Sequence, residues 1–579
     1  MKTSKDQQSS LFFFAIFVVV LLFTYKVTVW DAYFKPTAPP PPPKVTATSA
    51  PSETAAVPVV PSQSPGAQPN AVQPVVTTAP ATGAPSEEEI SSRVLEITTS
   101  DLNATVSLLG GRITRWELRH FAEKVEKGSP SLNLVEHVAG APYPLGIYSG
   151  EVDDSRVQYR LFEPATDVPL ILAGDDRGRV VLQGQLPDGR TAEKTITFYG
   201  SGYFVDVAVR LSAPPANAAP LALEWVKLVT PGSESFLDTH GNSGVVWFDG
   251  TRANRRGFDK VAAGEESLGN NRWIALSDKY FSVTMIATAL VPTEAYHLGA
   301  VYASRMMGDS IAGSFRVFGG PNSYTMLRNA GDSLELIINF GYLAFLCAPL
   351  LSLLHMFFQY TGNYGLAIAA LTILVKFAVL PLTAASFRSM KAMQDIQPEV
   401  VRLRNEVKDK QLQQQKLMEL YKDKGVNPLG GCFPILIQLP IFLGLYTALS
   451  LAIELRHAPF ALWIHDLSAP EKLPLLGIGI PVMVLLLVVS MLMQQWMTPS
   501  TMDPMQKKVM LVMPLVFGLM FMNFPAGLTL YWLVSNIISI GQTHALRRSG
   551  DKGGKRNGYV LTALVSAATY IFLHVLTLF

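Results

Sequence analysis

The sequence is poor in cysteine and in charge. Only 2 of its 579 residues are cysteines, Cys347 and Cys432, which excludes a disulfide-stapled scaffold and a cysteine-rich metal module. Charged residues make up 16%, below the roughly 25% of an ordinary soluble domain, whereas 49% of the residues are hydrophobic. The net charge of +2 gives no reason to expect direct DNA binding. This composition is typical of a polytopic membrane protein that carries a large soluble part.

Catalytic and metal-binding signatures are missing as well. The chain contains no G-x-S-x-G, H-E-x-x-H, Walker A or G-x-G-x-x-G pattern, and its nine histidines are scattered rather than clustered. Cys432 has no histidine near it in the sequence, which disfavours a role as nucleophile. We therefore expect no enzyme activity, no catalytic residues, no metal and no cofactor.

The N-terminal 86 residues are predicted to be an anchor followed by a linker. Residues 1–34 contain an apolar run, 11–25, that follows Lys2 and Lys5 and has no Ala-x-Ala cleavage site behind it. An uncleaved signal anchor with a cytoplasmic N-terminus is favoured over a cleaved signal peptide. Residues 35–86 are rich in Pro, Ala, Thr and Ser, a composition that cannot bury a core and predicts an extended periplasmic linker.

The segment 87–335 has the pattern of a β domain. Residues 113–118 alternate between apolar and polar side chains, and turn signals stand at Gly110-Gly111 and at Pro187-Asp188-Gly189. Short strands separated by such signals are typical of a sandwich. We therefore predict a large periplasmic β-sandwich domain.

Five apolar stretches within residues 363–548 predict a core of five transmembrane helices. The stretch 509–523 is short for a span but is followed by a Phe-Pro-Ala-Gly turn, and a bilayer that thins locally accepts shorter helices. The predicted spans are residues 364–382, 433–453, 478–497, 509–523 and 528–542.

A further apolar stretch, residues 343–358, precedes these spans. Were it a span, the basic segment between the first two core helices would lie outside, against the positive-inside rule. Pro349 and His355 also interrupt it. Residues 336–362 are therefore predicted to hold an amphipathic helix lying in the outer membrane interface.

The C-terminal residues 549–579 combine a basic loop with an additional apolar run, 559–579. This run either forms an extra transmembrane helix that crosses outward or lies as a hydrophobic tail on the membrane.

Lys376 lies in the middle of the first core span. A lysine at this depth costs roughly 3 kcal/mol on insertion scales, and none of the five spans contains an Asp or Glu that would pair with it. The side chain could reach the inner interface, bind a lipid phosphate or face a water-filled cavity. Polar residues in the other spans favour the cavity, although each also fits an ordinary helix–helix hydrogen bond. These include Gln438, Gln494 and Asn536.

The basic segment 384–426 is predicted to form a cytoplasmic hairpin of two amphipathic helices. Its apolar residues Met393, Ile396, Val400 and Leu403 are spaced by three and four. The sequence offers nothing obvious to cover this stripe, so we predict that it contacts client chains; a merely solvated hairpin is the alternative.

Several motifs in the core resemble the YidC/Oxa/Alb family of membrane protein insertases. They are NPLGGCFP (427–434), PFALWIHDL (459–467), DPMQKK (503–508) and FPAGL (524–528), followed by Tyr531-Trp532 and Ser535-Asn536. The anchor, the linker and the β domain resemble the Gram-negative form, whose outer domain is a β-supersandwich. The resemblance implies an α-helical polytopic protein of the bacterial inner membrane that inserts and folds other membrane proteins, alone or with the Sec translocon.

The family has a groove, open to lipid and cytoplasm, that bears one positive residue, usually arginine. Lys376 matches this residue, Thr372 and Tyr531 match positions that face the passing substrate, and Gln438 matches a polar groove residue. The predicted groove set is Lys376, Thr372, Gln438, Gln494, Tyr531, Trp532 and Asn536. Implied partners are nascent membrane proteins, the Sec translocon, membrane lipids and the ribosome. The family usually ends in a basic cytoplasmic tail, and residues 559–579 depart from that pattern, which leaves the ribosome contact open.

Two other classes of function remain as alternatives. A small-solute transporter or channel would also explain a lysine among membrane helices. An envelope-assembly protein would act through its β domain and use the helices as an anchor.

Overall fold

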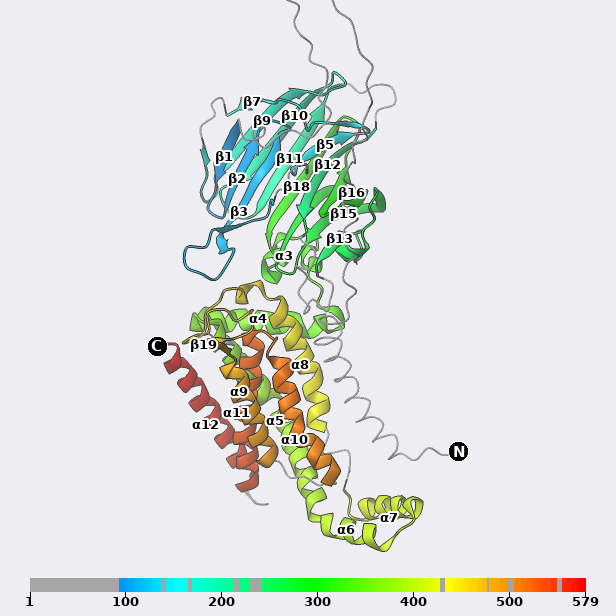
Figure 1. The fold of residues 1–579 in the computed structure, drawn as a ribbon, viewed down its shortest axis with the longest axis vertical. Coiled ribbons are helices and arrows are strands. Elements are labelled where there is room, and N and C mark those ends of the chain that lie inside the picture. Colours follow the sequence, from blue (N-terminus) through cyan, green and yellow to red (C-terminus); the bar gives the residue numbers. More distant parts are fainter. Residues whose placement is uncertain are drawn as a thin grey trace, which may run out of the picture. The chain divides into compact units, whose positions relative to one another are not determined.

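The fold is that of a computed structural model, which describes residues 93–578 except 137–140, 165–168, 213–218, 230–241, 427–432, 476–477, 498–503 and 549–553. The predicted anchor, 1–34, and the predicted linker, 35–86, lie outside the described residues. Among the described residues, a part rich in β-strands comes first along the chain and a helical part follows (Figure 1).

The first of two large sheets contains the alternating stretch that the sequence singled out. In this stretch Ile113, Trp116 and Leu118 are buried, whereas Arg115 is exposed. The turn before it uses Gly110 and Gly111 at φ +74° and +56°, a left-handed conformation that favours glycine. The strand order is β4-β3-β2-β1-β8. The strands are β1 (Val94–Thr98), β2 (Leu102–Ser107), β3 (Arg112–Ala122), β4 (Ser131–Asn133) and β8 (Leu170–Ile171).

The second sheet has 13 strands, with the main order β6-β5-β12-β17-β16-β18-β11-β10-β9-β7 and with β13, β14 and β15 attached beside β16. The long strands β15 and β16 contain two register irregularities, which bend the sheet edge. The strands are β5 (Gly146–Ser149), β6 (Val152–Asp153), β7 (Arg160–Glu163), β9 (Arg177–Gln185), β10 (Thr191–Tyr199), β11 (Phe204–Leu211), β12 (Leu221–Leu228), β13 (Gly244–Phe248), β14 (Ala253–Arg256), β15 (Glu266–Ser277), β16 (Phe281–Leu298), β17 (Val301–Met307) and β18 (Ala312–Pro321).

The two sheets pack face to face around Trp116. Its ring on β3 meets the ring of Trp225 on β12 edge to face at 5.6 Å between centroids, and its Nε1 donates to the carbonyl of Gly319 on β18. A Cβ at Gly319 would come within 2.7 Å of the Trp116 ring, so glycine is required for this contact. The predicted sandwich is confirmed.

A buried ion cluster lies between the sheets. The Lys194 ammonium on β10 donates to Asp154 Oδ2 at 2.8 Å and to three backbone carbonyls, and Arg112 donates to the other carboxylate oxygen at 3.0 Å. Lys194 and Asp154 are both fully buried. Burial lowers the pKa of Lys194 to about 8, and the nearby Asp154 carboxylate limits the decrease.

This cluster predicts a pH dependence of stability. Between pH 8 and the usual lysine value of 10.5 the unfolded chain binds the Lys194 proton more tightly, so the folded state gains stability as pH rises. Burial raises the pKa of Tyr148 to about 12, so ionisation of unfolded tyrosines reverses the trend above roughly pH 10. The thermal midpoint of the sheet signal in circular dichroism should rise from pH 7.5 to 9.5. Lys194→Met should abolish that rise, and an unchanged slope in this variant would contradict the assignment.

Within its described residues, the helical part begins with a short helix, α3, and continues with nine longer ones. These are α3 (Tyr324–Ala330), α4 (Ala344–Thr361), α5 (Tyr364–Asp395), α6 (Gln397–Glu406), α7 (Lys410–Asp423), α8 (Phe433–Leu451), α9 (Val482–Met497), α10 (Pro504–Phe521), α11 (Ala526–Arg548) and α12 (Gly554–Leu576).

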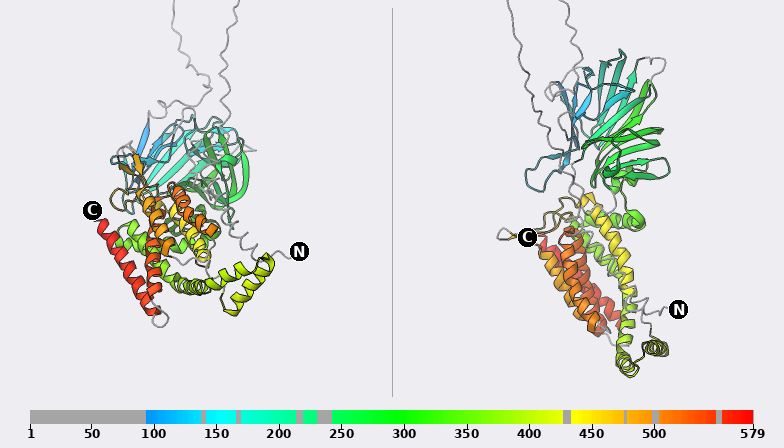
Figure 2. Two further views of the ribbon diagram at one scale, coloured as in Figure 1. Left: turned by 60° about the horizontal axis from the view of Figure 1, so that its bottom comes forward. Right: turned by 45° about the vertical axis from the view of Figure 1, so that its right-hand side comes forward.

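Two described helices, Gly341–Thr361 and Tyr364–Asp395, are long and apolar enough to cross a membrane, and four others contain shorter apolar stretches. Figures 1 and 2 show that α4 runs across one end of the helical bundle, whereas α5, α8, α9, α10 and α11 run along it. The placement of α4 in the membrane interface fits this orientation and stays a prediction.

Several boundaries differ from the sequence-based prediction, including the end of α11, which lies at Arg548 and not at the predicted 542. Residues 478–480 were expected to open the third span, but they form strand β20 (Ile478–Ile480), which pairs with β19 (Leu473–Leu475). Proline and glycine in this short hairpin keep it from joining the helix. Helix α5 continues past the predicted span end at 382 to Asp395, so the first arm of the predicted hairpin is partly an extension of the span. Helix α10 begins at Pro504, before the predicted 509.

The loop before α9 is fixed by Glu471, whose side chain is buried. The carboxylate accepts from the backbone N–H groups of Val482 and Met483, both at 3.1 Å, and from the indole of Trp463. A carboxylate at this position satisfies free N–H groups of the helix and complements the helix dipole.

Glu471→Ala should therefore lower the free energy of unfolding of the helical part by about 2 kcal/mol, because three donors lose their acceptor. The thermal midpoint of the purified full chain in detergent measures the effect. Lys472→Ala is the matched control, since the neighbouring Lys472 is exposed. Equal midpoints for the two variants would contradict the capping role.

Candidate functional site

Lys376 is a buried residue of α5, with 8% of its surface exposed. The helix is started by Asn363, whose side-chain oxygen accepts from the N–H groups of Gly365 and Leu366 and thereby caps the helix. The Lys376 Nζ donates to Ser539 Oγ on α11 at 2.8 Å. Among the residues that the structure describes, no charged group acts on Lys376. The ammonium is therefore held by a neutral hydroxyl, and its charge is not cancelled.

A second polar contact joins α8 to α11. Gln438 Nε2 donates to the Tyr531 hydroxyl at 2.8 Å, and Tyr531 is almost fully buried. Tyr531, Ser535 and Ser539 follow one another at spacings of four, so they lie on one face of α11. This polar row connects the contact with α8 to the contact with Lys376.

Trp532 lies where three helices meet. Its ring contacts Phe442 of α8 at 4.5 Å between centroids, and Phe517 and Phe521 of α10 at 5.8 and 5.1 Å. Helix α8 otherwise packs on α4, α5 and α11, whereas α10 packs on α9. Trp532 therefore bridges α8 and α10, and Phe524 joins them as well, through Tyr446 of α8 at 5.5 Å and Phe521 of α10 at 5.1 Å.

The other predicted groove residues are more dispersed. Thr372 is fully buried, and its hydroxyl donates to the Ile368 carbonyl one turn earlier in α5. Asn536 donates to Ser490 Oγ at 3.1 Å and so joins α11 to α9, which is the helix–helix hydrogen bond that the sequence left open as an alternative. Gln494 is half-buried on α9. The structure thus brings together Lys376, Gln438, Tyr531 and Trp532 around α11.

The expectation that the hairpin stripe is uncovered is wrong. Ile396 and Val400 are buried against Leu417 of α7, and Met393 and Leu403 pack on this small cluster. The two helices therefore cover each other's apolar faces. Exposed apolar residues of the hairpin lie elsewhere, at Val401, Leu412 and Met418. A contact between the hairpin and client chains stays a prediction.

Ser539 was missed by the sequence-based reasoning. Its position is eight residues after Tyr531 on the same helix face, and that spacing could have identified it. Which hydroxyl meets Lys376 depends on the relative shift of α5 and α11, and the sequence of either helix alone does not determine that shift.

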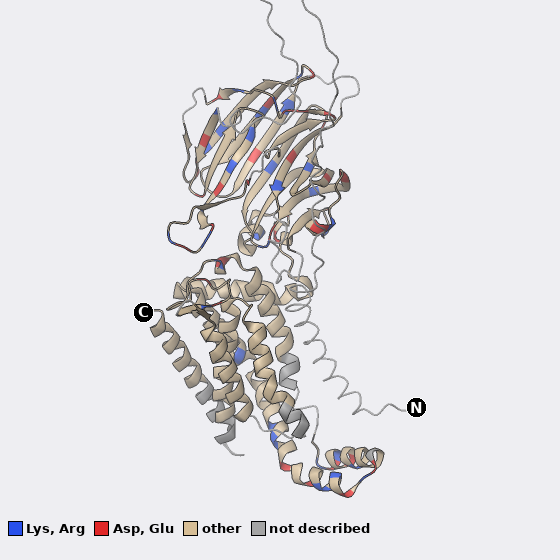
Figure 3. Cartoon of the chain, viewed as in Figure 1, with Lys and Arg blue, Asp and Glu red and all other residues tan. Residues whose placement is uncertain are grey.

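Charge is distributed unevenly over the described residues. Figure 3 shows charged side chains spread over the β domain and the hairpin α6–α7, whereas they are sparse along the bundle helices. Lys376 is thus an isolated cation among apolar helices.

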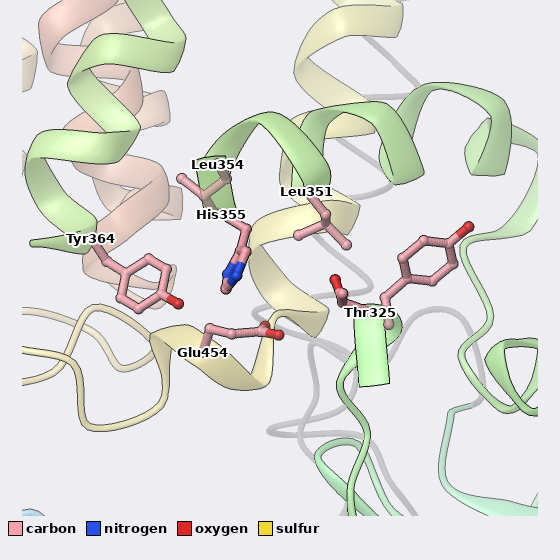
Figure 4. A pocket seen from close by; sticks show the side chains of 7 residues that line it. Thr325, Leu351, Leu354, His355, Tyr364 and Glu454 are labelled. Carbon is pink, nitrogen blue, oxygen red and sulfur yellow. The ribbon is translucent and has the colours of Figure 1, made fainter. Parts of the chain in front are cut away.

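One small pocket lies away from this site. Its lining comes from α3, α4, the start of α5 and the turn after α8, and His355 and Glu454 point into it from two sides (Figure 4). Glu454 also accepts from the Ser323 hydroxyl at 2.8 Å. None of the predicted groove residues lines it, so it is not part of the candidate site.

The fold and the site define a polytopic helical membrane protein with a buried cationic site and a separate β-rich domain. Two family models match the chain: the "YidC periplasmic domain" over residues 94–353 and the "60Kd inner membrane protein" over residues 356–553. The chain therefore belongs to the YidC family of membrane protein insertases. It acts on membrane proteins, is not an enzyme, and carries a periplasmic domain, as the resemblance in its motifs implied.

Curated relatives agree with this assignment. The chain is 35% identical to the membrane protein insertase YidC of Geobacter sulfurreducens over 77% of its own length and 85% of the relative. It is 34% identical to the insertase of Syntrophus aciditrophicus over 92% and 97% of the two chains. A crystal structure of an active YidC insertase with its first transmembrane domain matches with a TM-score of 0.36 and 17% identity, covering 79% of this chain and 94% of that one.

Proposed function

We propose that the chain inserts clients through a groove at α5, α8, α10 and α11, in which Lys376 attracts acidic residues of the client. The observation that carries this proposal is the hydrogen bond from Lys376 to Ser539, a neutral partner, in a bundle without a described carboxylate near it. A carboxylate partner would cancel the charge. A hydroxyl orients the ammonium and leaves its field available to a client.

The energetics need no nucleotide. Moving a polar client segment partway into the bilayer is costly, and attraction to Lys376 offsets part of that cost. Once the apolar segment of the client reaches lipid, the hydrophobic effect supplies the free energy for the completed step. The Gln438–Tyr531 contact and the aromatic residues around Trp532 would then line the groove along which the client passes.

We further propose a location and a set of partners. The positively charged hairpin favours an inner-membrane protein whose hairpin faces the cytoplasm, with the N-terminus on the same side. Nascent membrane proteins are the clients, the Sec translocon and the ribosome are the proposed protein partners, and the bundle contacts membrane lipids directly.

Site-specific photocrosslinking tests the groove. Benzoylphenylalanine in place of Phe442 or Phe517, which flank Trp532, should form adducts with a stalled nascent membrane protein. The same substitution at Phe572, which is 63% exposed on α12, should not. Equal adduct yields at all three positions would refute a groove at this place.

A further inference from the structure

The last helix lies beyond the part of the chain that the family model matches. The match ends at residue 553, and α12 runs over Gly554–Leu576. Its first residues include Lys555 and Arg556, and the apolar part, residues 559–576, corresponds to about 27 Å of helix, against a hydrocarbon thickness of about 30 Å. The helix is long enough to cross the membrane, and the family core does not account for it.

The burial pattern of α12 is the reverse of that of a helix on a soluble protein. The side chains buried against the bundle are Ser566, Thr569 and Leu573, two of which carry hydroxyls. The exposed side chains of its described part are apolar except His574 near the end, and the large ones are Leu564 at 59%, Ile571 at 62%, Phe572 at 63% and Val575 at 44% exposure. A hydroxyl-bearing inner face and an apolar outer face suit a helix surrounded by lipid hydrocarbon.

The contact between α12 and α11 is close. A Cβ at Gly541 of α11 would come within 2.7 Å of Val565, so only glycine allows the helices to approach this far. Leu573 belongs to the same apolar core as residues of α5, α9 and α11. Figures 1 and 2 show α12 running beside α11. Helix α12 is therefore packed into the bundle rather than laid on its surface.

This contact lies next to the lysine site. Helix α12 packs on α11 and also contacts α5, the two helices that contribute Ser539 and Lys376. Ser539 is two residues before Gly541 and so faces another side of α11, which places α12 behind the Lys376–Ser539 pair. The next residue, Gln542, has a buried Nε2, and Ser566, which follows Val565, has a buried Oγ. Neither atom has a partner among the described residues. Buried polar atoms of this kind are usually satisfied by water.

We propose that α12 is a sixth core transmembrane helix that runs antiparallel to α11 and walls off the Lys376–Ser539 pair from lipid. The hydroxyls and the Gln542 amide give this wall a polar inner face, and the apolar outer face contacts acyl chains. A client then reaches Lys376 from the cytoplasm or from the α8–α10 side, but not between α5 and α11. The consequence for client access rests on the proposed role of Lys376. The two tests below measure the position of α12 and do not measure insertion.

The first test determines topology. In the full chain with Cys347→Ala and Cys432→Ala, a single cysteine is introduced by Leu578→Cys, two residues after the end of α12. A membrane-impermeant maleimide should label it in right-side-out vesicles and not in sealed inside-out vesicles. Labelling from the cytoplasmic side would place α12 on the membrane surface and overturn the proposal.

The second test measures the wall. A Ser539→Cys reporter in the same background is exposed to a maleimide dissolved in the bilayer. Gly541→Leu should raise its labelling rate about tenfold. The bulk overpacks the tight contact between the helices and shifts the equilibrium from packed to displaced α12 by roughly that factor. Gly541→Ala should give a smaller rise, and Ala567→Leu, which adds three carbons on the exposed face where Gly541→Leu adds four, should give none.

Each outcome of the second test is informative. An equal labelling rate in the native background and in both Gly541 variants would show that α12 shields nothing and would overturn the proposal. If Gly541→Leu reduces the yield of monodisperse protein, the Gly541→Ala rate decides. If the Gly541 variants raise the labelling rate as expected but Lys376→Met inserts an acidic client as well as the native chain does, the proposed role of Lys376 is wrong and the wall stands.

Discussion

Lys376→Met should reduce insertion of a client with an acidic translocated tail by about two orders of magnitude. Two unit charges about 6 Å apart at an effective dielectric constant near 20 attract by roughly 3 kcal/mol, which corresponds to about a hundredfold in an equilibrium. Methionine keeps the length of the side chain and removes its charge, so packing against α11 changes little. Insertion into proteoliposomes, measured by protease protection of the client tail, gives the result.

The matched controls separate charge from shape. Lys376→Arg keeps the charge and should retain most of the activity, although the guanidinium meets Ser539 in a different geometry. A client whose tail carries Asn in place of Asp should be inserted equally by the native chain and by Lys376→Met. If the acidic client is also inserted equally by both, Lys376 is not the attractor.

Ser539 should act through Lys376 and not by itself. With Ser539→Ala, the ammonium loses its one hydrogen bond among the described residues, and the acidic client should be inserted about tenfold more slowly, because a hydrogen bond to a charged group contributes roughly 1.5 kcal/mol or more. In the Lys376→Met background the same substitution should have no further effect. An additive loss in the double variant would show that Ser539 contributes independently.

The membrane part was largely predictable because each of its signals is local. A lysine within an apolar run and basic segments between spans can each be recognised without knowing what packs against them. The features that were missed are relations between segments. Ser539 meets Lys376, and Ile396 and Val400 meet Leu417, only because of how two helices are placed together. An amphipathic stripe indicates that its apolar face is buried, but it does not identify the segment that packs on it. In the hairpin, the packing partner is the second helix.

In the β domain too, local features could be predicted from the sequence and contacts between distant segments could not. Its strands and turns follow from period two and glycine, whereas the Lys194–Asp154–Arg112 cluster joins residues 40 or more positions apart in the chain. A lysine inside a strand pattern could equally have been a solvent-facing residue. The pairing that buries it depends on the packing of the two sheets.

Of the substitutions in the helical part, Trp532→Ala should lower the stability most. Removing a large ring that three phenylalanines surround leaves a cavity, and the free energy of unfolding should fall by about 3 kcal/mol. Because Trp532 contacts both α8 and α10, the two helices should also separate more easily, although Phe524 still joins Tyr446 of α8 to Phe521 of α10. The thermal midpoint of the full chain and the distance between spin labels on α8 and α10 measure the two consequences.

The chain offers a matched control in a second tryptophan. Trp496, near the end of α9, is 92% exposed, so Trp496→Ala removes the same ring without opening a cavity. Its thermal midpoint should stay within about one degree of the native value, since exposed substitutions change stability little. Trp532→Phe should recover most of the loss, because a smaller ring still contacts Phe442 and Phe521. A broader distribution of α8–α10 distances in Trp532→Ala, absent in Trp532→Phe, would tie the aromatic cluster to the width of the groove and not only to stability.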